Sequence, residues 1–408
     1  MRSTTRHRWT AFHEAWAPRA DMPDGPAKTS PWSHHLVTAL LGTVIVVGLF
    51  LDGWAHLNLE TKLAPFLEPW HAVMYAGFVA SGAWIMTRNQ RRFRFQPSQL
   101  PRGYGLAVVG MAIAGVGVVG DALWHVIFGV ETGVARVLST FHVLPFAGTV
   151  LVLMTPLRAL WLDSSVGRLV SYARLLPALL ALSFTTAFVA YYLQYLSPFV
   201  NWSVTNVVQQ SPPVSAGADE LGLIARVGSI LVTNLLLLAP VLVLVRRWTP
   251  PPGSATTVFG VVTIMSSALN EFALGSLVAA GLAGGVTADL LLWRARTRSK
   301  IPQVRVIAAT VPVATWGAYF VALASAYGAV WPPELWMGTI VVTSLIGLAL
   351  SWLMFTSAPA ASSVGPTESA GSIFTEPIYL APLEEPTRIT LGSAEPGKSR
   401  RPAVVDRG

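Results

Sequence analysis

The sequence contains no cysteine. Disulfide bonds, thiolate metal ligands, iron–sulfur clusters and thiol nucleophiles are therefore excluded. Charged residues are also scarce, at 12% of the 408 residues, whereas hydrophobic residues make up 53%. The sequence has no P-loop, no Gly-x-Ser-x-Gly elbow and no His-Glu-x-x-His motif. These absences argue against P-loop nucleotide binding, serine hydrolase chemistry and zincin-type proteolysis.

Long apolar runs make up most of the sequence. Each is close to the length of about 20 residues that spans the hydrocarbon core of a bilayer. The sequence predicts an all-α, polytopic integral membrane bundle of about ten transmembrane helices. The apolar stretch 254–293 is too long for one span and is predicted to turn back near Asn270 and Glu271. The ten predicted segments are 36–56, 70–87, 104–127, 135–156, 174–196, 221–245, 255–272, 274–294, 304–327 and 335–355.

The basic residues predict the orientation. With both termini placed in the cytoplasm, 25 Lys and Arg residues fall on the cytoplasmic side and 3 on the outer side. This asymmetry follows the positive-inside rule, so the net charge of +8 needs no nucleic-acid partner. The excess of Arg over Lys, with abundant Ala, Gly and Val, favours a GC-rich bacterial genome. We therefore expect a bacterial plasma membrane protein whose surroundings are the lipid bilayer.

Four regions are expected along the chain. Residues 1–35 are predicted to be a disordered cytoplasmic N-terminal tail, and residues 356–408, rich in Pro, Ser and Glu, a disordered cytoplasmic C-terminal tail. Residues 36–156 are predicted to form two duplicated helical hairpins. Residues 157–355 are predicted to form the remaining six membrane helices.

The duplication carries the main functional signal, because Asp-x3-His followed by a second His occurs twice. Asp and His four residues apart share one face of a helix, and the second His begins the next, antiparallel helix. Each copy therefore predicts a three-ligand metal site near the outer ends of the helices. Ionisable side chains within a membrane are functional candidates by default. The predicted metal ligands are Asp52, His56, His71, Asp121, His125 and His142.

Other acidic residues are secondary candidates. Glu131, Glu271 and Glu334 lie in or beside predicted outer turns, where they would support the metal or handle protons. These residues and the two motifs are predicted to converge on one outer pocket if the bundle brings the hairpins together. Asp289, by contrast, lies near Arg294 and Arg296, and a surface ion pair is expected there.

The ligand types restrict the metal. Imidazole and carboxylate without sulfur suit copper, zinc or iron, and two His with one carboxylate also match the ligand set of non-haem iron sites. Three ligands leave open positions, as catalytic sites do. Whether the two copies form one dinuclear centre or two separate sites is left open by the sequence. A redox site would need other membrane subunits or an electron donor.

The motif resembles the metal site of the C subunit of the particulate methane and ammonia monooxygenases. In that family, Asp-x3-His on one membrane helix is completed by a later His, and the resemblance implies copper or zinc near the outer leaflet. Here the intervening gaps of 14 and 16 residues are longer, and the motif is doubled. The chain also resembles bacterial multi-pass proteins with repeated Asp-x3-His motifs.

Three functions are compatible with the sequence. The first is a metal-binding membrane protein, as an oxidoreductase or a subunit of one. The second is a transporter of a cation, proton or small solute, although Asn234 and a few Ser and Thr are nearly the only polar groups at helix centres. The third is a non-catalytic assembly or scaffold protein in which the Asp–His networks only hold helices together.

Overall fold

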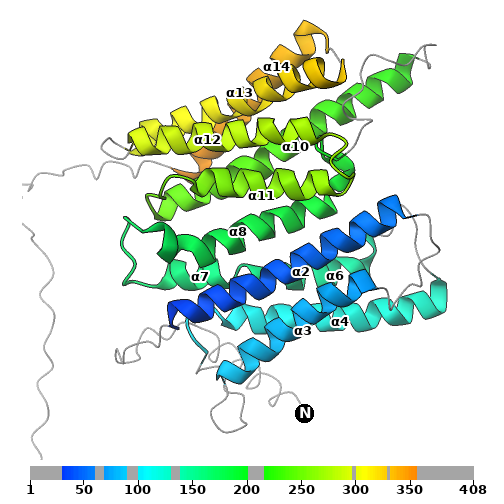
Figure 1. Ribbon diagram of the computed structural model, residues 1–408, viewed down its shortest axis with the longest axis vertical. Helices are drawn as coiled ribbons and strands as arrows, with labels where there is room; N and C mark the ends of the chain where they lie inside the picture. Colours follow the sequence, from blue (N-terminus) through cyan, green and yellow to red (C-terminus); the bar gives the residue numbers. More distant parts are fainter. Residues whose placement is uncertain are drawn as a thin grey trace, which may run out of the picture. The chain divides into compact units, whose positions relative to one another are not determined.

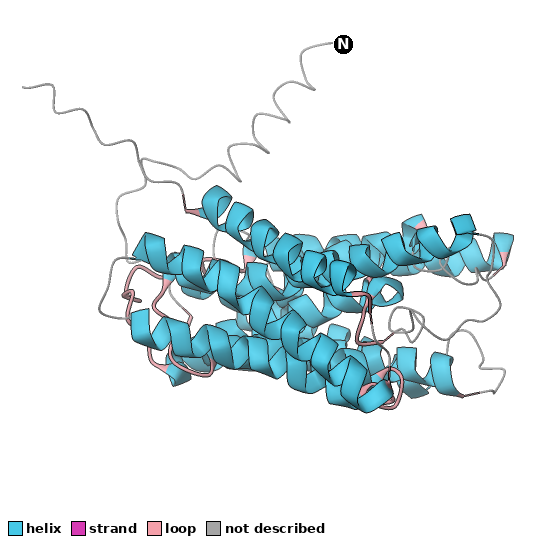
Figure 2. Ribbon diagram, turned by 90° about the horizontal axis from the view of Figure 1, so that it is seen from above, coloured by secondary structure: helices cyan, strands magenta, loops and turns pink. Residues whose placement is uncertain are grey.

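The computed structural model describes residues 30–59, 69–89, 100–129, 138–200, 216–295, 300–328 and 331–355. These residues are almost entirely helical and contain no β-strand, as predicted (Figure 2). The principal helices are α2 (Trp32–Asn58), α3 (Pro69–Asn89), α4 (Gly105–Phe128), α6 (Thr140–Leu153), α7 (Thr155–Leu162), α8 (Tyr172–Tyr192), α10 (Ala216–Arg247), α11 (Ser254–Ala268), α12 (Val278–Arg294), α13 (Lys300–Tyr327) and α14 (Pro333–Met354).

Eight spans within the described ranges are long and apolar enough to cross a membrane, with α6 and α7 counted together as one span. The membrane class is thereby confirmed. Each of the ten predicted segments overlaps at least one helix. However, α3 is not one of the eight, and α11 is apolar but shorter than 18 residues. The count of ten spans and the side of the membrane on which the termini lie stay predictions.

Several pairs of consecutive helices pack closely as antiparallel neighbours, whereas others, such as α3 and α4, make little contact. The closest pairs are α2 with α3, α4 with α6, α11 with α12, α12 with α13, and α13 with α14. Helix α8 lies at the centre and packs on both α2 and α11. Figure 1 shows α3 and α4 at one end of the row of helices and α14 at the other. The two duplicated hairpins therefore occupy one end of the bundle.

Several boundaries differ from the sequence prediction. Helix α2 begins at Trp32, so His35 is part of the helix and is buried rather than lying in a tail. The segment predicted over 135–156 is divided at Met154, where α6 ends and α7 begins with Pro156 in its first turn. The predicted tails 1–29 and 356–408 lie outside the described residues.

The turn predicted at residues 270–271 is confirmed. Helix α11 ends at Ala268, and Glu271 and Phe272 have φ values of 57° and 59°. This left-handed conformation is uncommon for non-glycine residues and reverses the chain tightly before α12. The turn is also held by Asn58, whose side-chain amide donates a hydrogen bond to the Leu269 carbonyl over 2.8 Å.

Glycines allow the duplicated hairpins to pack closely. A Cβ on Gly110 would collide with the carbonyl oxygen of Gly148, so α4 and α6 meet backbone to backbone. In the first hairpin, a Cβ on Gly48 would fall 2.7 Å from the Cα of Met74. Small residues at helix contacts are typical of membrane bundles. Gly115, Gly117 and Gly120 have the spacing of a dinucleotide fingerprint but lie inside α4, without the preceding strand that such a site requires.

Asp289 is a helix cap, and the surface ion pair expected for it is wrong. The side chain is buried on α12, and its carboxylate accepts hydrogen bonds from the backbone amides of Ala255 (3.0 Å) and Thr256 (2.9 Å). The Thr256 hydroxyl donates a third hydrogen bond over 2.7 Å. Asp289 thus satisfies the free N–H groups at the start of α11, where the helix dipole also favours a negative charge.

Replacing this cap should measurably destabilise the bundle. In Asp289→Ala the two amides lose their acceptor inside the protein, which typically costs about 1 to 3 kcal/mol. Thermal unfolding in detergent should show this decrease in stability as a lower melting temperature. The matched control is Glu334→Ala, which removes an exposed acid from the first turn of α14 and should change stability by less than about 0.5 kcal/mol. Equal melting temperatures for the two variants would contradict the capping role.

Candidate metal centres

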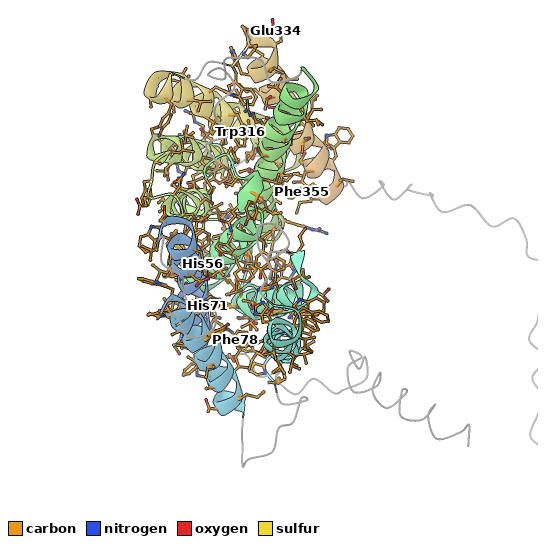
Figure 3. All side chains as sticks on the ribbon, turned by 90° about the vertical axis from the view of Figure 1, so that its right-hand side faces the viewer. His56, His71, Phe78, Trp316, Glu334 and Phe355 are labelled. Atoms are coloured by element: carbon orange, nitrogen blue, oxygen red, sulfur yellow. The ribbon has the colours of Figure 1, made fainter. Side chains whose placement is uncertain are left out.

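The first predicted ligand set comes together where α2 ends and α3 begins. Asp52 and His56 lie one turn apart on α2, and His71 is the third residue of α3. The Asp52 Oδ1 atom is 3.7 Å from His56 Nε2 and 2.8 Å from His71 Nδ1. Ligand atoms from all three residues lie within 4.8 Å of one another. Figure 3 shows His56 and His71 adjacent, on neighbouring helices.

The second ligand set repeats this arrangement at the junction of α4 and α6. The Asp121 Oδ1 atom is 3.6 Å from His125 Nε2 and 3.4 Å from His142 Nδ1. The same atoms are therefore used as in the first copy: Nε2 from the helix that carries the aspartate and Nδ1 from the next. The two imidazole rings in each copy have centroids 5.9 Å apart. The duplication seen in the sequence is thus also a duplication of geometry.

The two copies are separate groups. The ligand atoms of each set lie within 4.8 Å of one another, and among the residues that the structure describes no group combines the two sets. A dinuclear centre requires metal ions about 3.5–4 Å apart, with ligands shared around both. Two separate mononuclear sites fit the structure better than one dinuclear centre.

Both aspartates are shielded from solvent. The Asp52 side chain is 7% exposed and the Asp121 side chain 16% exposed. Within the ranges that the structure describes, the buried Oδ1 atom of each lies within ion-pair distance of two imidazole nitrogens but accepts no hydrogen bond of good geometry. A buried carboxylate oxygen is costly unless hydrogen bonds or a cation compensate for its lost hydration. A metal ion between this oxygen and the two imidazoles would provide that compensation, so the donor set fits a divalent transition metal.

Tyrosines surround both sites, and the sequence offered no reason to single them out. Tyr75, one turn after His71, has its ring centroid 5.7 Å from that imidazole. On α8, the Tyr191 ring packs directly against Gly53, next to Asp52. The following residue, Tyr192, donates a hydrogen bond to the His142 carbonyl over 3.3 Å. The Tyr191 and Tyr192 contacts come from α8, far along the chain, and the motif spacing does not reveal them.

The secondary acidic candidates do not join either group. Glu271 is exposed in the turn between α11 and α12, and Glu334 is exposed at the start of α14. Figure 3 shows Glu334 at one end of the bundle, away from His56 and His71 in the other half, so the structure does not bring Glu334 to these histidines. Glu131 lies outside the described residues.

Comparison with known proteins adds no relative. No protein-family model matches the chain, and no curated protein and no solved structure shows significant similarity to it. The geometry of the two Asp–His–His groups is therefore the basis for assigning a function.

Proposed function

We propose that this chain is an integral membrane protein that binds one transition-metal ion at each of two Asp–His–His sites. The observation that supports this most strongly is the repeated geometry. In both copies, one aspartate oxygen faces an Nε2 and an Nδ1 atom at 2.8–3.7 Å. The duplicated hairpins thus present the same three donor atoms, one carboxylate oxygen and two imidazole nitrogens, at metal-site spacing in both copies. Under the positive-inside orientation, both sites lie at the extracytoplasmic face of a bacterial plasma membrane.

The ligand set favours copper, zinc or iron. When bound, such an ion supplies open coordination positions for redox or Lewis-acid chemistry, because three protein ligands do not fill its coordination sphere. The residues of the chain would hold the ion, exclude lipid from it and fix the imidazole orientations. As an oxidoreductase or a subunit of one, the protein would take electrons from a membrane partner. The resemblance to the C subunit of particulate monooxygenases supports the same function, with copper or zinc as the bound metal.

The polar side chains at the centre of the bundle give less support to a transport function. Asn234, the main polar residue there, is buried and holds three helices together. Its amide donates to the Thr343 carbonyl over 3.1 Å, and its side-chain oxygen accepts from Trp316 Nε1 over 3.1 Å. Many buried threonines, such as Thr263 and Thr315, donate to carbonyls of their own helices. These groups are used for packing and do not line a path across the membrane.

Elemental analysis of detergent-purified protein tests the proposal. Wild-type protein, reloaded with Cu, Zn or Fe and freed of excess metal, should retain the ion in stoichiometric amount. The double variant His56→Ala/His125→Ala removes one ligand from each site and should retain almost none. A thermal melt of both proteins without metal controls for folding. No retained metal in folded wild-type protein would reject the proposal and leave scaffolding, in which the Asp–His pairs only join helices.

A further inference from the structure

Tyr75 lies one turn further along α3 than His71, on the same face of the helix. Side chains of an α-helix lean toward its N-terminus, so each residue covers the turn that precedes it. Helix α3 begins at Pro69, and this direction places the Tyr75 ring over the turn that carries His71. The two ring centroids are 5.7 Å apart with a tilt of 31° between the rings, as this direction requires. The Tyr75 side chain therefore extends toward the first site.

The hydroxyl of Tyr75 is a polar group in need of a partner. The residue is partly buried, and within the part of the chain that the structure describes its hydroxyl makes no hydrogen bond. The hydroxyl of Tyr192, in contrast, donates to the His142 carbonyl. A buried hydroxyl without a partner costs free energy, and tyrosine hydroxyls usually find one. A metal ion at the first site would provide a partner for the Tyr75 oxygen.

The second copy differs at this position. The sequence offset that aligns His71 with His142 also aligns Tyr75 with Phe146, and the next two residues are Ala and Gly in both copies. Phe146 has no donor atom, and its ring packs on α8 with its centroid 4.0 Å from that of Tyr192. An oxygen donor is therefore present beside the first site and absent from the equivalent position of the second.

We propose that the Tyr75 oxygen is a fourth ligand of the metal ion at the first site, and that the second site has only its three ligands. This inference rests on the proposed metal-binding function. Tyrosine oxygen also ligates iron in some haem proteins. The phenol proton passes to solvent when the oxygen binds the ion, since metal ligands bind in their deprotonated form. The first site then has four protein donors, as closed sites do, whereas the second keeps an open position for a substrate.

Copper(II) spectroscopy can examine the two sites one at a time. Asp121→Asn leaves only the first site intact and Asp52→Asn only the second, so each protein with one equivalent of Cu(II) reports on one site. A Cu(II) ion bound to a phenolate absorbs visible light by charge transfer. Resonance Raman excitation in that band enhances the ring vibrations of the tyrosine. Both signals are expected in Asp121→Asn and neither in Asp52→Asn.

A matched pair of tyrosine variants in the Asp121→Asn background assigns the signals to one residue. Tyr75→Phe removes only the oxygen, so it should abolish both signals and lower the affinity for Cu(II) by roughly 10-fold or more. Tyr191→Phe removes the other hydroxyl next to the Asp52 turn and should leave both signals unchanged. Thermal melts without metal control for folding of the two variants.

Elemental analysis of the same samples separates this inference from the proposed function. Signals that survive Tyr75→Phe, or Cu(II) bound to Asp121→Asn without any tyrosine signal, would overturn the assignment of Tyr75 and leave a three-ligand site. Tyrosine signals in Asp52→Asn would overturn the difference between the two sites. Folded protein that retains no Cu(II) at either site would reject both proposals, because Cu(II) binds nitrogen and oxygen donors more tightly than other first-row divalent ions.

Discussion

If each triad binds a metal ion as proposed, Asp52→Asn should remove the ion at the first site and leave the one at the second site in place. The substitution preserves the size of the side chain but removes the negative charge that faces His56 and His71 at 3.7 and 2.8 Å. Loss of a group that only supports a metal ligand weakens affinity by roughly 10- to 100-fold, and loss of the charged ligand itself should exceed this. Titration of the metal-free protein with a competing chelator should resolve the change.

The second copy provides the internal control for this prediction. Asp121→Asn should abolish the other site, and the double variant should bind no metal tightly. Glu271→Gln neutralises an exposed acid at the same end of the helices and should leave both sites unchanged. If Asp52→Asn instead weakened both ions equally, the two triads would act as one centre, contrary to their separation in the structure.

The second large effect is expected from Gly148→Val. A side chain at this position would collide with the Gly110 carbonyl oxygen and lie 2.6 Å from the backbone nitrogen of Ala114. Helix α6 would have to move away from α4, at a cost of about 3 kcal/mol or more because a backbone must shift rather than a flexible side chain. Since α4 carries Asp121 and α6 carries His142, the second site should be lost.

The informative result is whether Gly148→Val loses the second metal site while the first site is retained. The first site depends on α2 and α3, which pack through Gly48 and Met74, so it should retain its metal in Gly148→Val. Gly317→Val places the same side chain on α13 where nothing lies within 4 Å of the Cβ, and it should affect neither site. Metal content and thermal unfolding measured on the three proteins test both points. Retention of both ions in Gly148→Val would show that the second site does not need the close packing of α4 on α6.

The sequence alone determined the class of the protein and the ligand sets of both candidate sites. An apolar run of spanning length predicts a membrane helix from the local sequence alone. A four-residue spacing determines which side chains share one face of that helix. A short connection then brings the next helix back beside the first. For this reason Asp52, His56 and His71, and likewise Asp121, His125 and His142, come together as predicted.

Contacts between distant parts of the chain were decided only by the tertiary structure. Asp289 caps α11 from α12, Asn58 holds the turn before Glu271, and Tyr191 packs beside Asp52 from α8. Glu334 lies at one end of the bundle, away from His56 and His71, although its place near a predicted outer turn was equivalent to that of the other acids. Helix order across the membrane is set by the packing of complementary faces, and this information is spread over many side chains rather than carried by a short motif.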